Sequence, residues 1–312
     1  MFSYRHAFHA GNHADVLKHM VLIATLKYLT EKPAALMVID THAGAGLYRL
    51  DGDYAGKSGE ADDGVLKLFK AIALVDTAQA AMKSVAPRSV VLQDYLDLVA
   101  AFNHAGKPKV YPGSPFVIQR LLRHEARDKL KCFELHPTDH VSLEGNIGQL
   151  EVGRQVAIAR ADGFEALKAL LPPPLRRALV LIDPSYEIKS DYARVPACVA
   201  DCLKRFPGGS YMVWYPVIPR PEAHDLPRRL KTLATQAGKS WLHTTLNIGQ
   251  HADMAQVTMP DEKAPRPGLT ASGVFLINPP HTLKTALQAA LPPVLDALGR
   301  GRGQGFTVDG GG

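Results

Sequence analysis

Residues 179–186, LVLIDPSY, join a run of four apolar residues to an acid, a proline, a serine and a tyrosine. A short, continuous apolar run is typical of a strand that is buried on both faces. Ligands of open α/β sheets bind beyond the carboxyl ends of the strands, so Asp183 is well placed for chemistry. Asp and Pro are also common in ordinary turns, and these eight residues alone leave both interpretations open.

A glycine-rich turn, Asp40 to Gly46 (DTHAGAG), follows an earlier apolar run. Glycines after a strand allow the backbone to approach a ligand closely. A dinucleotide-binding turn of the G-x-G-x-x-G type would need a third glycine at position 49, which is Arg49. The pattern D-x-x-x-G-x-G instead resembles the first motif of S-adenosylmethionine-dependent methyltransferases.

Two further apolar runs also end in an acidic residue, Glu134 in CFELHP and Asp162, before Gly163, in ARADGF. Glu134 could accept hydrogen bonds from ribose hydroxyls. Such an acid normally lies about 20 residues after the glycines, and an insertion at 51–107 accounts for the longer spacing. Asp162 could bind the amino group of an adenine. Each acid alone is more simply a helix cap or a surface turn, but acids at four successive strand ends favour a single crevice.

The fourth strand end suggests a reaction. An exocyclic amine on an aromatic base is a poor nucleophile because its lone pair is delocalised into the ring. The Asp183 carboxylate and the Pro184 carbonyl could accept its two N–H bonds and favour a pyramidal nitrogen aimed at a methyl donor. Tyr186 could stack on the base, a contact worth ~1–3 kcal/mol. The sequence therefore predicts methyl transfer to an amine without a metal ion.

Seven apolar, β-branched runs predict strands, and helical patterns lie between most of them. This alternation indicates a largely parallel sheet with right-handed crossovers. The expected fold is α/β, a doubly wound, seven-stranded Rossmann-like sheet. Its edge is expected to be antiparallel, because Pro-rich sequence instead of a helix joins the last two runs. The seven runs are residues 34–40, 129–135, 155–162, 177–183, 210–217, 240–248 and 272–280.

Three segments fall outside this alternation. Asn12 can cap an N-terminal helix that runs to about Thr30. Residues 51–107 are interpreted as an inserted helical subdomain, with helices around 60–84 and 88–105. Residues 300–312 are Gly-rich and are expected to be a disordered tail. The methyltransferase domain would then comprise residues 1–50 and 108–299, including an N-terminal tip and helix at 1–33.

The composition limits the class of protein. The chain has 312 residues, of which 46% are hydrophobic, and 36 Lys+Arg against 30 Asp+Glu give a net charge of +6. This excess suits a polyanionic partner. No apolar run is long enough to cross a membrane, and the polar N-terminus does not resemble a secretory signal. The three cysteines make an odd count and are expected to be reduced, which predicts a cytoplasmic protein.

Several longer motifs together resemble the RlmJ family of bacterial 23S rRNA adenine-N6 methyltransferases. They extend from residue 2 to about 280. The resemblance implies S-adenosylmethionine-dependent N6-methylation of one adenine, adenine 2030, in protein-free or partly assembled 23S rRNA. It also implies a monomer that needs neither metal nor membrane. The motifs are SYRHAFHAGNHADVLKH, DTHAGAG, YPGSP, ELHP, ADGF, IDPSYE, WYPV and TASGVFLINPP.

The resemblance implies roles for individual residues. Asp183 would be catalytic together with Pro184 and Tyr186. Tyr4, His6 and Lys18 would contact the RNA or close the site as a lid. One departure concerns Ser185, which stands where the family usually has the second proline of Asp-Pro-Pro-Tyr. Cofactor contacts are implied for Lys18, His19, His42, Gly44, Ser114, Glu134, Asp162, Gly163 and Asp183.

Three alternatives remain. A metal could bind the N-terminal histidines with Asp15, since imidazole clusters suit zinc or iron, but His13 and His19 are six residues apart and lie on different helix faces. A non-catalytic RNA-binding module would fit the net charge and leave the acidic strand ends without a purpose. DNA adenine or a protein amide could be the methyl acceptor, and only the family resemblance favours 23S rRNA. The histidines are His6, His9, His13 and His19.

Overall fold

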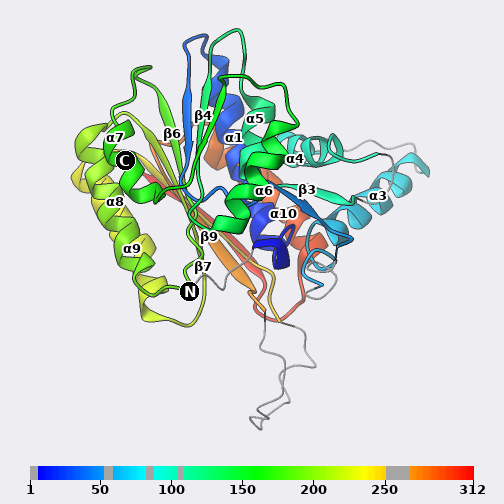
Figure 1. The fold of residues 1–312 in the computed structure, drawn as a ribbon. Coiled ribbons are helices and arrows are strands. Elements are labelled where there is room, and N and C mark those ends of the chain that lie inside the picture. Colours follow the sequence, from blue (N-terminus) through cyan, green and yellow to red (C-terminus); the bar gives the residue numbers. More distant parts are fainter. Residues whose placement is uncertain (1–5, 53–58, 82–87, 105–107, 251–267) are drawn as a thin grey trace.

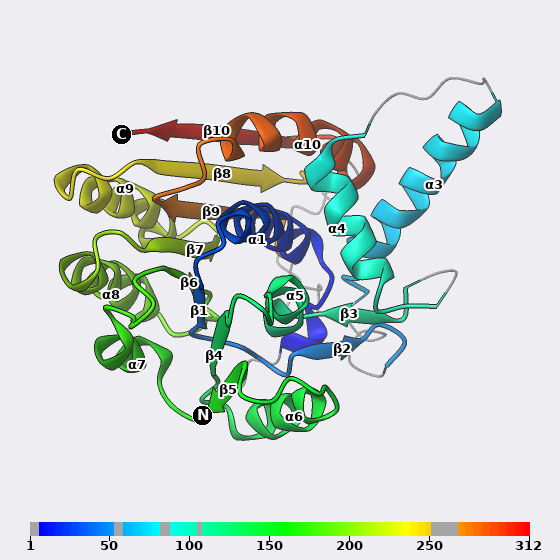
Figure 2. The same ribbon diagram turned by 90° about the horizontal axis from the view of Figure 1, so that it is seen from above.

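The computed structural model describes residues 6–52, 59–81, 88–104, 108–250 and 268–312. An eight-stranded sheet forms the centre of the molecule, with helices on both of its faces (Figure 1). The view from above shows which helices cover each face (Figure 2). On one face lie α7 (Gly163–Leu170), α8 (Asp191–Arg205) and α9 (Pro221–Gln236), and on the other α1 (His13–Glu31), α5 (Ser114–Leu121) and α10 (Leu283–Leu298).

The strand order is β10-β8-β9-β7-β6-β1-β4-β5, and the five strands from β7 to β5 are parallel. From β1 the chain first adds β4 and β5 on one side and then β6 and β7 on the other. The order therefore reverses beside β1, which is where ligands bind in open α/β sheets. The strands are β1 (Met37–Asp40), β4 (Lys129–Phe133), β5 (Val156–Ala159), β6 (Ala178–Ile182), β7 (Ser210–Pro216), β8 (Trp241–Asn247), β9 (Ala271–Ile277) and β10 (Gly305–Gly311).

The seven expected strands are all present, and every residue of β1 and β6 is buried, as their continuous apolar runs predict. The antiparallel pairing expected between the last two runs is confirmed, because β8 pairs with β9 from Trp241–Ile277 to Asn247–Ala271. β9 is not at the edge, however. It lies between β8 and β7 and is antiparallel to both.

The expectation of a disordered tail at 300–312 is wrong, and the sheet has eight strands instead of seven. β10 pairs with β8 in antiparallel register over seven residues. Phe306 and Val308 lie two residues apart along it, and both pack against the hydrophobic core. This two-residue alternation is the mark of a half-buried strand. The surrounding glycines concealed it in the sequence.

The N-terminal helix α1 begins at the expected cap. The Asn12 side chain accepts hydrogen bonds from the backbone N–H groups of Ala14 and Asp15. The helix lies against β7, β8 and β9 and is covered on its other sides by α4 (Val90–Ala100), α5 and α10. Residues 16–23 are consequently all buried, including two polar side chains, Lys18 and His19.

Two helices follow one another in the insertion, α3 (Val65–Ala81) and α4. Two short strands bracket them and pair with each other, β2 (Leu47–Arg49) and β3 (Val110–Pro112). α4 packs against α1 and α10, and α3 packs against α10. The inserted helices therefore share a hydrophobic core with the N-terminal helix. Within the described residues no helix has the length and apolar character needed to cross a bilayer.

Candidate active site

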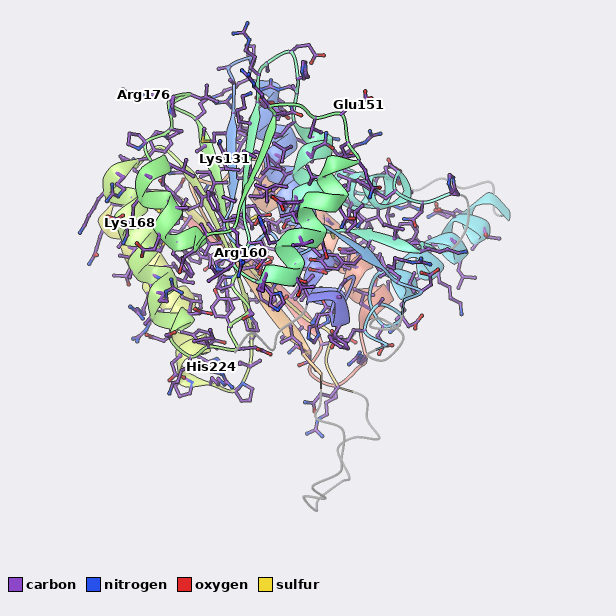
Figure 3. The ribbon with its side chains drawn as sticks, in the orientation of Figure 1. Lys131, Glu151, Arg160, Lys168, Arg176 and His224 are labelled. Atoms are coloured by element: carbon purple, nitrogen blue, oxygen red, sulfur yellow. The ribbon has the colours of Figure 1, made fainter. Side chains whose placement is uncertain are left out.

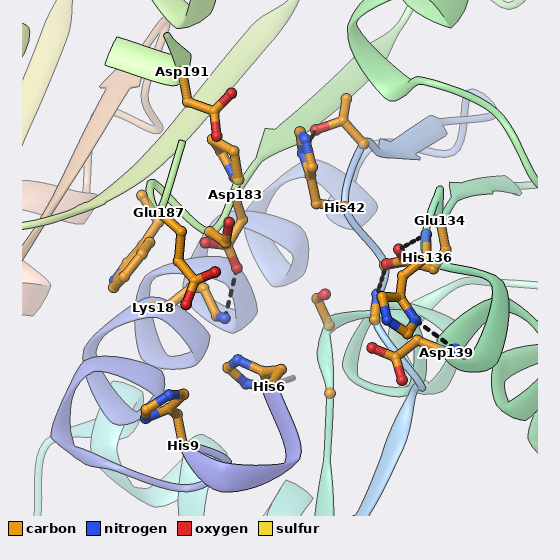
Figure 4. A pocket seen from close by; sticks show the side chains of 18 of the residues that line it. His6, His9, Lys18, His42, Glu134, His136, Asp139, Asp183, Glu187 and Asp191 are labelled. Atoms are coloured by element: carbon orange, nitrogen blue, oxygen red, sulfur yellow. Dashed lines mark hydrogen bonds and ion pairs between the residues drawn. The ribbon is translucent and has the colours of Figure 1, made fainter. Parts of the chain in front are cut away.

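A cavity of about 550 Å³ lies beyond the carboxyl ends of β1, β4, β5 and β6, at the reversal of the strand order. This volume is in the range of small-molecule sites. The N-terminal end of α1 and the short helix η1 (His6–Phe8) close one side of it (Figure 4). The cavity brings together ten of the residues predicted for the site: His6, Lys18, His42, Gly44, Ser114, Glu134, Asp162, Gly163, Asp183 and Pro184.

Glu134 is held at one end of the cavity by two backbone groups. The N–H of Gly44 donates to Oε2 at 2.8 Å, and the N–H of His136 donates to Oε1 at 2.7 Å. Burial raises the pKa of Glu134, although these two donors oppose the rise. Gly44 has a φ of +60°, and a Cβ there would lie 2.3 Å from the hydroxyl oxygen of Tyr48. Each carboxylate oxygen has a second lone pair, so Glu134 keeps the capacity to accept from a ligand.

Asp162 is also bound by backbone groups, because its Oδ1 caps α7. It accepts from the N–H of Phe164 at 2.9 Å, while its Oδ2 accepts from Arg194 at 2.6 Å. Burial would raise the pKa of Asp162, but Arg194 and the helix N–H groups outweigh it, so the pKa is lowered. A Cβ on Gly163 would lie 2.1 Å from the carbonyl oxygen of Thr41. Only glycine therefore fits at this position, where the segment that follows β5 contacts the segment that follows β1.

Asp40 ends β1 and His42 follows it in the glycine turn, and burial favours the uncharged form of both side chains. Asp40 is fully buried behind the glycine turn, and burial raises its pKa to about 7 although Ser114 donates a hydrogen bond to it. Burial lowers the pKa of His42 to about 4. The His42 ring makes an edge contact with Phe164, with centroids 4.9 Å apart. His42 is therefore a neutral group of the cavity wall at physiological pH.

Asp183 lies at the other end of the cavity and is bound by a side chain from a distant element. The Lys18 Nζ lies 2.7 Å from Asp183 Oδ2 (Figure 4) and 2.9 Å from Asp15 Oδ1. Burial would lower the pKa of Lys18, but the two carboxylates outweigh it and raise the pKa. Burial raises the pKa of Asp183, and the Lys18 ammonium opposes this. One ammonium thus holds two buried carboxylates.

The second oxygen of Asp15 binds the N-terminal tip. His6 Nε2 lies 3.0 Å from Asp15 Oδ2, and the N–H of Gly11 donates to the same oxygen at 2.9 Å. Burial would raise the pKa of Asp15, but His6 and Lys18 together hold it well below its usual range. The result is a continuous chain of contacts, His6–Asp15–Lys18–Asp183.

Tyr186 does not line the cavity, which contradicts the expectation that its ring stacks on the substrate base. Its φ of +55° turns the ring into the core, where it contacts Tyr192, with centroids 4.7 Å apart. The Tyr186 hydroxyl donates to the Trp214 carbonyl at 2.8 Å. Trp214 itself lines the cavity, and the Lys18 ammonium lies 5.8 Å from its ring centroid.

His19 is likewise absent from the cavity wall, so the expected cofactor contact is not seen. It is buried between helices, where its Nδ1 lies 2.9 Å from the Tyr111 hydroxyl oxygen. Burial lowers its pKa to about 3. Tyr4, expected to contact RNA, lies outside the described residues.

Three of the four histidines of the metal alternative have separate side-chain partners. His6 contacts Asp15, His9 contacts Glu60 at 2.9 Å, and His19 contacts Tyr111. In the part of the chain that the structure describes, no group of three His, Cys, Asp or Glu side chains is placed to hold a metal ion.

The site also contains three residues for which no role in methyl transfer was predicted, Asp15, Trp214 and Arg194. Asp15 had a detectable signal, because it is three residues before Lys18 and such pairs meet on a helix face. Trp214 stands in the WYPV motif, but a strand tryptophan is more often simply a core residue. For Arg194, on α8, the pairing with Asp162 depends on how α7 and α8 pack.

Comparison with known proteins gives this geometry a family. Residues 33–309 match the family model described as "Ribosomal RNA large subunit methyltransferase D, RlmJ". The chain belongs to the RlmJ family. The expected α/β methyltransferase fold is confirmed by this membership, with the correction from seven strands to eight.

Relatives in the RlmJ family align over nearly the whole chain. The Ribosomal RNA large subunit methyltransferase J of Escherichia coli (strain K12) is 38% identical over 292 residues, which cover 94% of this chain and 92% of that protein. The protein of the same name from Haemophilus influenzae is 36% identical over 299 residues, covering 96% and 94%. The crystal structure of a Legionella pneumophila protein superposes with a TM-score of 0.78 at 28% identity, covering 97% of this chain and 98% of that chain.

Proposed function

We propose that this RlmJ family member uses S-adenosylmethionine to methylate N6 of one adenine in 23S rRNA, adenine 2030, before the large subunit is fully assembled. The family model and both curated relatives carry the name of a large-subunit ribosomal RNA methyltransferase. The observation that carries the proposal is the position of Asp183 and Pro184, which line one cavity together with Glu134 and Asp162. An RNA substrate of this kind would place the reaction in the cytoplasm.

The Glu134 end of the cavity fits the proposed cofactor. Glu134 keeps acceptor capacity for ribose hydroxyls, and Gly44, which has no side chain, lines the cavity beside it. Asp162 and His42 line the wall beside them, where an adenine amino group would find an acceptor. When bound, S-adenosylmethionine supplies a methyl group already activated by its sulfonium charge.

The Asp183 end would hold the target amine. The Asp183 carboxylate and the Pro184 carbonyl accept the two N–H bonds and orient the nitrogen lone pair toward the donor. The Lys18 ammonium opposes the rise in the Asp183 pKa that burial causes, and it fixes one of the carboxylate oxygens. The base must first leave its stack, which costs a few kcal/mol. Trp214 provides the aromatic surface on which it can be received, in place of Tyr186.

The distribution of charge supports a base inside the cavity and phosphates outside it. The cavity wall carries more acidic than basic side chains, with Asp183, Glu187 and Asp191 on one side (Figure 4). Exposed basic residues lie instead on the outer surface, among them Arg160 and Lys168 (Figure 3). Phosphate contacts with such residues weaken as salt concentration rises. Binding of the RNA is therefore expected to weaken with salt.

Transfer of labelled methyl from S-adenosylmethionine to a 23S rRNA transcript tests the proposal. We expect incorporation at one adenine N6 of the naked transcript, and much slower incorporation into intact large subunits, where packed RNA adds to the cost of unstacking. A matched Asp183→Ala protein is the control for contaminating activity. Labelling of duplex DNA in preference to the transcript, or equal rates on naked RNA and intact subunits, would contradict the proposal.

A further inference from the structure

Asp15 connects two groups that approach the reaction end of the cavity from different elements. Its Oδ1 lies 2.9 Å from the Lys18 ammonium, and its Oδ2 lies 3.0 Å from His6 Nε2. Its side chain is only 2% exposed. A buried carboxylate is costly unless it is paired, so its presence here requires these partners.

The position of the Lys18 ammonium depends on Asp15. Lys18 has a flexible four-carbon side chain, and a single contact with Asp183 would leave its ammonium free to pivot about that oxygen. The second contact, to Asp15, fixes the nitrogen between two carboxylates, 2.7 Å from one and 2.9 Å from the other. Asp15 is itself fixed, because it lies in the first turn of α1 and accepts from the backbone N–H of Gly11.

We propose that Asp15 is a positioning residue for methyl transfer, which holds Lys18 against Asp183 and holds His6 beside the cavity. This inference rests on the proposed function, since it assigns Asp15 a part in the same reaction. Asp15 itself does not touch the target amine. Its effect reaches Asp183 through Lys18, so its loss changes the geometry at Asp183 and leaves the Glu134 end of the cavity intact.

Single-turnover methyl transfer to the 23S rRNA transcript, with cofactor and RNA saturating, tests the inference with Asp15→Asn. The amide keeps an acceptor for Gly11 and removes the charge that fixes Lys18. We expect transfer to slow about 10- to 100-fold, because small displacements of reacting groups have effects of this size. The Kd for S-adenosylmethionine is expected to stay within about twofold, which a general loss of structure would not allow.

A double-mutant cycle distinguishes action through Lys18 from an independent effect. In a Lys18→Met background, Asp15→Asn should cost less than about threefold, because the ammonium that it positions is already gone. Equal costs in both backgrounds would overturn the inference. The matched control is Asp94→Asn. It removes the ion pair between Asp94 on α4 and Lys27, which lies on α1 as Asp15 does but away from the cavity.

Two further outcomes are separable. If Asp15→Asn does not unfold cooperatively, Asp15→Glu replaces it, because this variant keeps the charge and displaces the carboxylate by one methylene. A folded Asp15→Glu protein with an unchanged rate would also overturn the inference. If the unsubstituted protein fails to methylate the transcript, the proposed function fails first. A wild-type rate in a folded Asp15→Asn protein rejects the inference alone.

Discussion

The two ends of the cavity hold their acids in different ways. At one end, Glu134 and Asp162 accept from backbone N–H groups within turns and helix starts that follow their own strands or the neighbouring one, and Asp162 accepts in addition from the Arg194 side chain. At the other end, Asp183 depends on Lys18, which lies 165 residues away in the sequence. A backbone N–H donor is retained after almost any side-chain substitution that leaves the turn intact. Side-chain contacts are lost with a single substitution.

This difference separates binding from reaction. Substitutions at the Glu134 end are expected to change the affinity for the cofactor, since the acceptors there face a ligand that stays bound throughout the reaction. Substitutions at the Lys18 end are expected to change stability and the rate of transfer, because buried charges there are balanced only by one another. The following predictions test this division.

Lys18→Met is expected to have the largest effect on stability. It leaves Asp15 and Asp183 buried without their shared ammonium, and removal of one partner from a buried ion pair costs about 3–5 kcal/mol. Urea unfolding followed by circular dichroism measures the change. Lys27→Met is the matched control, because Lys27 is 47% exposed in its pair with Asp94 and should lose no more than about 1 kcal/mol. Equal losses in the two proteins would remove the distinction between the two pairs.

Asp183→Ala is expected to slow single-turnover transfer by about 10²–10³-fold, the usual cost of losing a preorganised partner of the reacting group. The cofactor Kd should remain nearly unchanged. Asp183→Asn should be milder, because the amide oxygen still accepts one N–H bond. If Asn is as damaging as Ala, the carboxylate also takes a proton. A near-wild-type rate for Asp183→Ala would show that the end of β6 is only a turn.

Asp40→Asn tests the buried acid beneath the glycine turn, which has neither a cation nor a helix end as its partner. In the folded protein its pKa is about 7, above the unfolded value of 3.8, so between these pH values only the folded state keeps the proton. Wild-type stability should therefore fall with rising pH, by roughly 1.4 kcal/mol per pH unit. The variant lacks this contribution. Its free energy of unfolding relative to that of the wild type should therefore rise by about 2–3 kcal/mol between pH 5 and pH 7. Urea unfolding of both proteins at each pH cancels the contributions of the histidines.

Glu134→Ala is expected to weaken S-adenosylmethionine binding by about 1–3 kcal/mol, the cost of leaving hydrogen-bonding groups without an acceptor. Isothermal titration calorimetry gives the affinity, and single-turnover transfer at saturating cofactor should stay close to the wild-type rate. A normal Kd combined with slow transfer would reverse the roles assigned to the two ends of the cavity.

Most of the fold could be predicted because its signals are local. The long apolar runs, the Asn12 cap and the two inserted helices lie close to where the sequence places them. The strands that were missed lack such signals. β2 and β3 have three residues each, too few to show a period. β10 is rich in glycine, and its pairing with β8 depends on an edge that exists only after the sheet has formed.

The residues of the site divide in the same way, into those with a local sequence signal and those without one. Glu134 and Asp162 follow from the rule that strand ends meet at one edge of a sheet, which requires no knowledge of side-chain packing. Asp15 and Trp214 were given no role in methyl transfer, because their importance for it depends on where α1 packs across the sheet. The expectation for Tyr186 failed because the left-handed backbone at this residue, which a motif does not reveal, directs the ring inward.

β10 follows the other seven strands of the sheet along the chain, and this order matters while the protein is being synthesised. The strands that carry the cavity, β1 and β4 to β7, leave the ribosome before it, and domains fold as their residues emerge. Before β10 pairs with it, β8 presents a row of unpaired N–H and C=O groups to its surroundings. The strands that form the cavity are thus synthesised before the strand that covers the edge of β8. An uncovered strand edge can pair with another chain, so the pairing of β10 protects the finished sheet from association through β8.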